Sequence, residues 1–316
     1  MFGADLVSIS ITIGSIYALM AVGLTLTLAV LKLPNLAHAE LITVGAYSFV
    51  VLIDFFSVNA LFAFLVAAVI GALFAVVGEI FVYRPLNSRK ASRYILILAS
   101  FAFGLIVRYS LYIWAANYNI LFLQNLISND VVFVFGGLSF NRLASWIIPV
   151  TISMTVFVHL LLNRTLVGKS MRSMESNIVL SRISGVNTKR ITLITWAIVG
   201  SLTGLGGAFW SIQTQVHPEM GFDVLLDVFA IVVLAGLTSF YGTLVGSYVI
   251  SFSENLFMGY LNSAYGISLA YQPIIPFVVI IVVLLVRPSG LQKTGSTNGL
   301  LQYLRSMLRR SGSSAI

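Results

Sequence analysis

The 316-residue sequence contains no cysteine, and only 9% of its residues are charged. Without cysteine the chain has no disulfide bonds and no thiolate metal ligands, and cysteine usage says nothing of its redox compartment. The charged fraction is far below the roughly 25% of an average soluble domain. Hydrophobic residues, in contrast, make up 59% of the chain. This composition indicates a protein that crosses a membrane several times.

Apolar stretches without Asp, Glu, Lys or Arg recur along the whole sequence. Each reaches the roughly 20 residues that a helix needs to cross a hydrocarbon core of about 30 Å. The 25 glycines and the lack of period-2 alternation do not fit the strands of an outer-membrane barrel. We therefore predict an all-α, polytopic transmembrane bundle with broken or re-entrant segments. The stretches are Leu6–Leu31, Phe55–Gly78, Leu143–Asn163, Ile191–Pro218, Val228–Ser253 and Asn255–Val286.

Basic residues gather in a few places. Of the 18 Lys and Arg residues, 15 fall within Tyr83–Arg93, Arg164–Arg190 and Arg287–Arg310. Short basic loops between spans mark the cytoplasmic side, so this charge does not indicate a nucleic-acid partner. With these clusters inside, about eight or nine spans are expected, with the N-terminus outside and the C-terminus in the cytoplasm. No basic residue precedes the first apolar run, so we expect no cleavable signal.

The chain is therefore expected to form one transmembrane domain, residues 1–290, followed by a cytoplasmic basic tail, residues 291–316. An external loop is expected at residues 117–142 and a cytoplasmic segment at residues 164–190. In the external loop, VVFVFGGLSF predicts a β-hairpin turning at Gly136 and Gly137, which either closes the loop or meets an external partner. In the tail, GLLQYLRSMLRR predicts an amphipathic helix on the inner membrane surface.

Two of the apolar runs are interrupted in a similar way. LPNLAHAE (33–40) precedes TVGAYSFV, and AGLTSFYG (235–242) precedes LVGSYVIS. Paired interrupted segments in the two halves of a transporter indicate its binding region, where broken helices direct free backbone groups at the substrate. The residues predicted to line a substrate path are Asn35, His38, Glu40, Gly236, Thr238, Ser239 and Gly242.

The polar residues of the first interruption also allow a structural role. His38 and Glu40 are two positions apart, so on a helix they point away from each other and do not predict a metal site. They either contact substrate or form a polar hinge packed between helices. Glu40 is expected about two turns from the cytoplasmic surface, paired with a basic loop residue. Arg108 is expected to reach toward the outer surface.

Two other acidic residues lie beside apolar runs. Glu79 is expected to form an interfacial pair with Arg84. Glu254 separates two uncharged runs and is therefore expected to face protein or water.

The cytoplasmic segment contains VGKSMRSMESNIVLSRISGVNTKR, residues 167–190. Its GKS is not a phosphate-binding loop, because Asn163 stands where that motif needs a glycine. Apolar residues recur at helical spacing from Gly168 to about Ser184, and Gly185 is a plausible C-cap. The pattern predicts one short amphipathic helix, either at the membrane surface or in a partner's groove. Its main residues are Gly168, Met171, Arg172, Met174, Asn177, Ile178 and Gly185.

Several motifs in the same order resemble one family, the permease subunits of ABC importers for branched-chain amino acids, particularly its LivH-like half. The resemblance covers residues 14–291. It rests on GSIYALMAVGLTLT, LPNLAHAELITVGAY, EIFVYRPLNSRK, GKSMRSMESNIVLSRISGVNTKR, VHPEMGF, AGLTSFYGTLVGSY and VVIIVVLLVRPSGL.

This resemblance implies a non-catalytic, multi-pass subunit in the cell membrane, without a cofactor. Implied partners are a second, LivM-like permease, two cytosolic ATP-binding subunits that dock on the cytoplasmic segment, an extracytoplasmic substrate-binding protein and membrane lipid. Urea, short amides and sugars remain alternative substrates. Other classes are an ion-coupled transporter or channel, and an intramembrane enzyme with His38 and Glu40 as acid-base groups.

Overall fold

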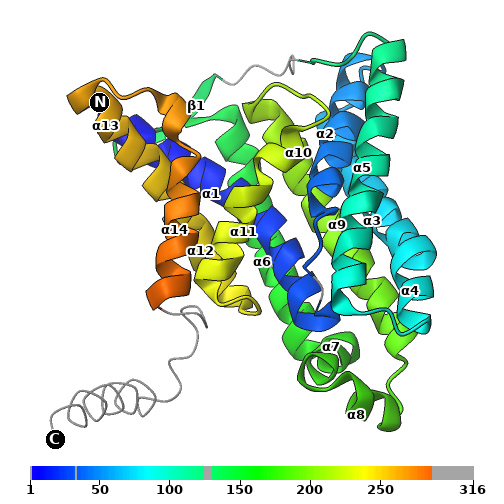
Figure 1. Ribbon diagram of the computed structural model, residues 1–316. Coiled ribbons are helices and arrows are strands. Elements are labelled where there is room, and N and C mark those ends of the chain that lie inside the picture. Colours follow the sequence, from blue (N-terminus) through cyan, green and yellow to red (C-terminus); the bar gives the residue numbers. More distant parts are fainter. Residues whose placement is uncertain (1, 33, 124–129, 287–316) are drawn as a thin grey trace, which may run out of the picture.

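The computed structural model describes residues 2–32, 34–123 and 130–286, which form a helical bundle with one small hairpin (Figure 1). The third basic cluster and the expected tail helix lie outside these residues. The elements are α1 (Phe2–Leu26) with a π-helical turn (Thr27–Leu31), α2 (His38–Asp54), α3 (Ala60–Gly78) with a π-helical turn (Glu79–Tyr83), α4 (Arg84–Ser88), α5 (Arg93–Asn117), β1 (Val131–Phe135), β2 (Leu138–Asn141), α6 (Arg142–Arg164), α7 (Leu166–Ser176), α8 (Ile178–Ile183), α9 (Thr188–Gln213), α10 (Met220–Asp223), α11 (Leu225–Ala235), α12 (Phe240–Phe252) with a π-helical turn (Ser253–Phe257), α13 (Met258–Tyr265), a 3₁₀ turn (Leu269–Tyr271) and α14 (Ile274–Val286).

Six helical segments of the described chain are long and apolar enough to cross a membrane. The expected eight or nine spans also require the shorter helices α2, α11 and α12. Helix α11 has 11 residues and is therefore about 17 Å long, well short of a hydrocarbon core of about 30 Å. The expected interruptions are thus present as real helix ends. The six segments are Asp5–Leu31, Ala60–Ser88, Arg93–Asn117, Arg142–Arg164, Thr188–Gln213 and Leu269–Val286.

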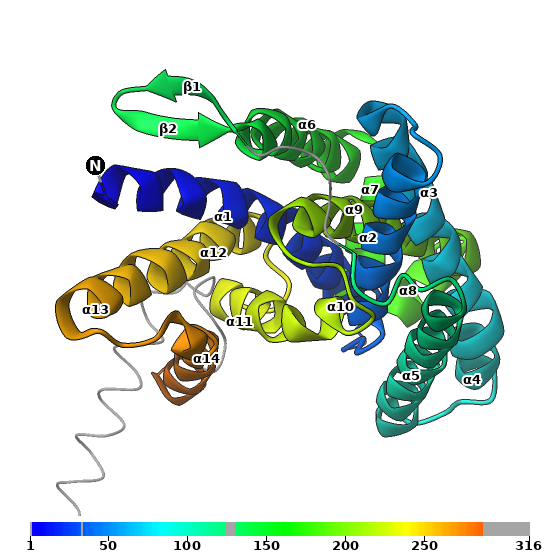
Figure 2. The ribbon, with the colours of Figure 1, turned by 90° about the horizontal axis from the view of Figure 1, so that it is seen from above.

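The centre of the bundle is built around α1 and α9. In the most apolar window of α1, 94% of the residues are buried, against 11% for the last long segment. From above, α6, α12 and α11 surround α1, while α2 and α3 lie across α9 (Figure 2). The outer helices α3, α5, α6 and α14 carry exposed apolar side chains. In a protein that spans a membrane these are the faces available to lipid or to another apolar partner.

Glycines allow α9 to approach α2 and α3 at backbone distance. A Cβ atom on Gly45 of α2 would lie 2.2 Å from the carbonyl oxygen of Gly204, and one on Gly71 of α3 would lie 2.3 Å from that of Gly200. Small residues at such crossings are typical of membrane helices, which gain their stability from close packing. This seam fixes α2, and hence the polar residues at its start, against the core.

Polar residues mark the helix ends. The side chains of Asn59, Ser92, Asn141 and Asn187 each accept a backbone N–H bond at the start of α3, α5, α6 and α9, respectively. Such caps replace partners that the first turn of a helix lacks, and water cannot supply them within a membrane. The starts of these four helices are therefore fixed by the residue that directly precedes each one.

The two ends of the bundle differ in character. Both described basic clusters, on α4 with the start of α5 and on α7 to α9, lie at the lower end in Figure 1, opposite the hairpin and α13. The predicted hairpin is confirmed: β1 pairs antiparallel with β2. Its turn has φ +59° at Gly136 and +81° at Gly137, a conformation that glycine adopts readily.

Candidate functional site

The first interruption separates the π-helical turn after α1 from α2, which begins inside the bundle. After the π-helical turn, Lys32 adopts a left-handed conformation (φ 54°), and the chain rises to begin α2 at His38 (Figure 1). His38 contacts Met20, which precedes the end of that turn by 11 residues, or about 16 Å along a helix. The start of α2 is therefore deep in the bundle, as expected of a broken segment.

Asn35 holds the bend of this segment. Its side-chain oxygen accepts hydrogen bonds from the Ala37 backbone N–H (3.1 Å) and the Tyr83 hydroxyl (2.8 Å). The backbone N–H of Leu36 donates to the Ser100 hydroxyl at 3.1 Å. Asn35 is only 1% exposed. The interruption is thus tied to α3 and α5 by side chains that replace missing helix bonds.

His38 is completely buried, and its side chain connects α2 with α1 and α9. Its Nε2 lies 3.0 Å from the carbonyl oxygen of Met20, which accepts the hydrogen bond, and 3.4 Å from the Thr203 hydroxyl. Its Nδ1 has no partner among the described residues. His38 and Glu40 do not converge, and the described residues contain no group of three His, Cys, Asp or Glu side chains that could hold a metal.

Glu40 forms a buried ion pair with Arg108 of α5. Its Oε1 accepts from Nε at 3.0 Å and from an Nη at 2.5 Å, and the two residues are 3% and 8% exposed. The guanidinium carbon also lies 4.5 Å from the ring centre of Phe222. Two expectations are therefore wrong: Glu40 pairs with an intramembrane arginine instead of a basic loop residue, and Arg108 turns inward instead of toward the surface. Mutual neutralisation makes the inward arrangement favourable.

The second interruption lies between α11 and α12. Helix α11 ends at a left-handed Gly236 (φ 97°), and the Leu237 N–H returns to the Val232 carbonyl at 2.8 Å. The buried Ser239 hydroxyl accepts from the Gly242 N–H at 2.9 Å and so begins α12. Thr238 is exposed in this turn. Both predicted interruptions are thus present. Four of the residues predicted to line a substrate path are buried and form hydrogen bonds or ion pairs within the chain: Asn35, His38, Glu40 and Ser239.

The expected pair Glu79–Arg84 is confirmed, with Nε and Oε1 3.5 Å apart. Glu79 also accepts a hydrogen bond from the Trp196 indole N–H at 3.0 Å, and the Tyr83 ring stacks on Trp196 with ring centres 4.9 Å apart. This cluster joins the end of α3 to the start of α9.

The segment expected to be cytoplasmic, residues 164–190, contains two short helices, α7 and α8, and not the single helix expected. Helix α7 ends before Asn177, whose side chain accepts the N–H groups of Val179 and Leu180 at 3.0 Å each and begins α8. At the other end, Gly185 has the predicted left-handed conformation (φ +86°). The Val186 N–H bonds to the Ser181 carbonyl at 3.0 Å, which completes a Schellman cap.

The apolar stripe of α7 has a partner within this chain, contrary to expectation. Met171 and Met174 are 1% and 2% exposed, and they pack with Ala29, Val30 and Ile191 at the ends of α1 and α9. The α6–α7 junction is equally tight, because a Cβ on Gly168 would lie 2.1 Å from a backbone oxygen of the preceding turn. Helix α7 is therefore fixed to the spans.

Helix α8 exposes the apolar surface that α7 does not. Val179, Leu180 and Ile183 are 68%, 60% and 77% exposed at the charged end of the bundle. Helical periodicity alone could not separate these side chains from the buried methionines, since it predicts a stripe and not what covers it.

A polar cluster that the sequence did not reveal lies between α1, α11 and the π-helical turn after α12. The Tyr17 hydroxyl is 3.2 Å from Asp227 Oδ2 and 3.1 Å from Glu254 Oε2. Glu254 is 2% exposed, which confirms that it faces protein. Among the described residues neither carboxyl has an ion-pair partner within 4.0 Å. The cluster thus places two carboxyls beside one hydroxyl inside the bundle.

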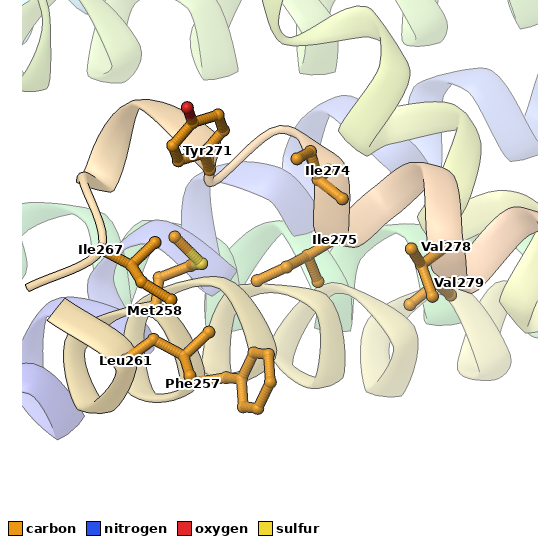
Figure 3. Close-up of a pocket in the computed structure, with 9 residues that line it drawn as sticks. All are labelled: Phe257, Met258, Leu261, Ile267, Tyr271, Ile274, Ile275, Val278 and Val279. Carbon is orange, nitrogen blue, oxygen red and sulfur yellow. The ribbon is translucent and has the colours of Figure 1, made fainter. Parts of the chain in front are cut away.

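Two cavities differ in chemistry. One, of about 350 Å³ between α13 and α14, is lined by apolar side chains and the ring of Tyr271 (Figure 3). A polar solute needs some convergent polar groups, which this lining does not supply. The other, of about 630 Å³, opens at the charged end beside both interruptions. Its lining includes Lys32, Arg93, Glu175 and Thr238.

Residues 6–284 match the family model described as the branched-chain amino acid transport system permease component, so the chain belongs to this family of multi-pass membrane permeases. It is 30% identical to a probable LivH branched-chain amino acid permease of Methanocaldococcus jannaschii, over 89% of this chain and 90% of the relative. Identity to LivH of Salmonella typhimurium is 24% (89% and 92%), and to the ribose import permease RbsC of Escherichia coli 28% (86% and 82%). No solved structure matches.

The ion pair of Glu40 predicts that losing the arginine alone destabilises the protein more than replacing both partners. Arg108→Gln leaves Glu40 buried without its cation and should destabilise the protein by about 3–5 kcal/mol. The double variant Glu40→Gln/Arg108→Gln should recover part of this loss, because two amides can still form a hydrogen bond. Thermal unfolding of the purified protein in detergent measures the coupling.

The exposed Arg89, changed to Gln, is the matched control at the charged end of the bundle and should leave the melting temperature unchanged. Equal melting temperatures for Arg108→Gln and Arg89→Gln would show that the buried pair does not stabilise the fold.

Proposed function

We propose that this chain is the non-catalytic membrane subunit of an ATP-driven importer for branched-chain amino acids. The observation that carries the proposal is the family match over nearly the whole bundle, together with the relatives named for that transport. A second, LivM-like permease of similar fold completes the translocation path. Two cytosolic subunits hydrolyse ATP, and an extracytoplasmic protein delivers the substrate.

The proposed topology has eight or nine crossings, with the N-terminus outside. Two arginine- and lysine-rich clusters at one end of the bundle support a cytoplasmic assignment for that end. The hairpin and α13 are then extracytoplasmic. The short α11 and the deep start of α2 supply the broken segments.

The substrate path is proposed to run beside the two interruptions. Of the residues predicted from sequence, Thr238 and Gly236 lie in the turn nearest the charged-end cavity, and Gly242 lets α12 begin close to the end of α11. Asn35, His38 and Glu40 hold the first interruption in place, and Ser239 holds the second. In this proposal the helices move about these buried contacts when the path opens and closes.

Coupling to ATP hydrolysis is proposed to use α8 as the contact and α7 as the lever. The exposed Val179, Leu180 and Ile183 suit an apolar groove in an ATP-binding subunit, where burial contributes about 25 cal/mol per Å². Arg182 and Lys189 surround them with positive charge. Force on α8 passes through the buried Met171 and Met174 to the ends of α1 and α9.

Reconstituted vesicles test the transport function. We expect uptake of labelled leucine that requires ATP and the partner subunits, and that excess isoleucine or valine inhibits while urea and ribose do not. Uptake driven by an ion gradient without ATPase subunits would instead place the chain among secondary transporters or channels. Inhibition by ribose alone would make it a sugar permease.

Charge placed on α8 should uncouple the transporter. Leu180→Asp or Ile183→Asp should abolish stimulated ATP hydrolysis and leucine uptake, because a buried carboxylate without a partner prevents docking. The amount and melting temperature of the permease should stay unchanged, since both side chains are exposed. Gly185→Val should act in the same way by straining the left-handed cap.

Two further variants separate docking from folding. Asn87→Asp places the same charge on the exposed surface of α4 and should transport normally. Met174→Asp should lower the melting temperature, because Met174 is buried within the chain. Normal coupling in both α8 variants would remove α8 from the ATPase contact.

Orientation can be measured directly because the chain has no native cysteine. In intact cells, Ser88→Cys and Ser176→Cys should resist an impermeant thiol reagent, whereas Ser139→Cys in the hairpin should react. The reverse pattern would invert the topology and leave α8 on the wrong side for a cytosolic ATPase. Labelling after permeabilisation controls for thiols that are merely inaccessible.

A further inference from the structure

The charged-end cavity brings together four elements that are distant in sequence. Lys32 follows the π-helical turn of α1, Thr238 lies in the turn between α11 and α12, and Glu175 lies on α7. Arg93, at the start of α5, also lines the cavity. The cavity of about 630 Å³ therefore lies where both interruptions meet the proposed coupling lever.

Charges of both signs face this cavity without neutralising each other. Among the described residues, Lys32, Arg93 and Glu175 form no ion pair within 4.0 Å. Lys32 is nevertheless close enough to influence Glu175: burial raises the pKa of the Glu175 carboxyl, and the charges of Lys32 and Arg172 oppose that rise. Both a cationic and an anionic partner for a ligand are thus available.

The rest of the lining is mainly aliphatic. Leu28, Ala29, Ile97 and Leu237 contribute apolar surface beside the charged groups. A ligand that satisfies the whole lining carries a carboxylate, an ammonium group and a short aliphatic chain. Urea and sugars carry none of these three features.

We propose that this cavity is a binding site for zwitterionic aliphatic amino acids at the cytoplasmic end of the path, with Lys32 and Arg93 facing the carboxylate and Glu175 facing the ammonium group. The site rests on the proposed function, because it is where imported substrate leaves the membrane domain. It also connects release with energy use, since Glu175 is part of α7. Movement of the lever changes the distance between the two charged sides and so weakens the site.

Substrate protection of an introduced thiol tests the site in the full-length chain in lipid nanodiscs. Thr238→Cys and, as a second reporter, Leu28→Cys should react with a charged thiol reagent. Leucine at about ten times its dissociation constant should slow both reactions about tenfold by mass action. Isocaproate, which lacks the ammonium group, and isoamylamine, which lacks the carboxylate, should protect little at the same concentration.

Three comparisons decide the outcome. Ser88→Cys, exposed at the same end but outside the cavity, should react at an unchanged rate with leucine present. Lys32→Gln and Glu175→Gln should each abolish protection of the reporters. Absence of protection in both reporters, or equal protection by isocaproate, overturns the proposal.

Leucine uptake by the otherwise unchanged chain, measured in parallel, separates this proposal from the proposed function. Uptake without protection rejects only the cavity as a binding site. Loss of ATP-dependent leucine uptake in the fully assembled transporter rejects the function on which the site rests.

Discussion

Backbone polar groups that leave a helix inside a membrane must find partners within the protein, and this constraint shapes the start of α2. Lys32 and residues 34–37 are not helical, yet α2 begins deep in the bundle at His38. Asn35, Tyr83 and Ser100 supply hydrogen-bonding partners for the interruption. The glycine contacts between α2 and α9 then hold the helix that follows. The interruption is therefore a fixed part of the architecture, and the surrounding helices are arranged around it.

The same constraint explains why polar residues near the path are mostly satisfied within the chain. Glu40 is neutralised by Arg108, and Glu79 is held by Trp196 and Arg84. The contacts of Glu40 with Arg108 and of Glu79 with Trp196 join helices that are far apart in sequence, whereas Arg84 follows Glu79 by five residues. These residues therefore connect elements of the bundle, and charged groups that form no ion pair among the described residues line the cavity at the charged end: Lys32, Arg93 and Glu175.

Local features of the fold could be predicted from sequence, whereas contacts between distant segments could not. Gly136, Gly185 and Gly236 are needed for left-handed turns, and such signals are read within a few neighbouring residues. The pairing of Glu40 with Arg108 depends instead on how α2 packs against α5. Tyr17, Asp227 and Glu254 likewise meet only after three elements pack. Their approach leaves no periodic signal in any one segment.

Helices α7 and α8 show why this distinction matters for the proposed mechanism. Helical spacing identifies Met171 and Met174 as part of an apolar stripe, but the residues that cover them are at the ends of α1 and α9 in the same chain. A stripe that docked only on a partner would let α7 move independently of the spans. A stripe already packed against them fixes α7 to the ends of α1 and α9. Packing within the chain therefore buries the stripe of α7 and leaves the apolar side chains of α8 exposed, which is the arrangement that the proposed coupling requires.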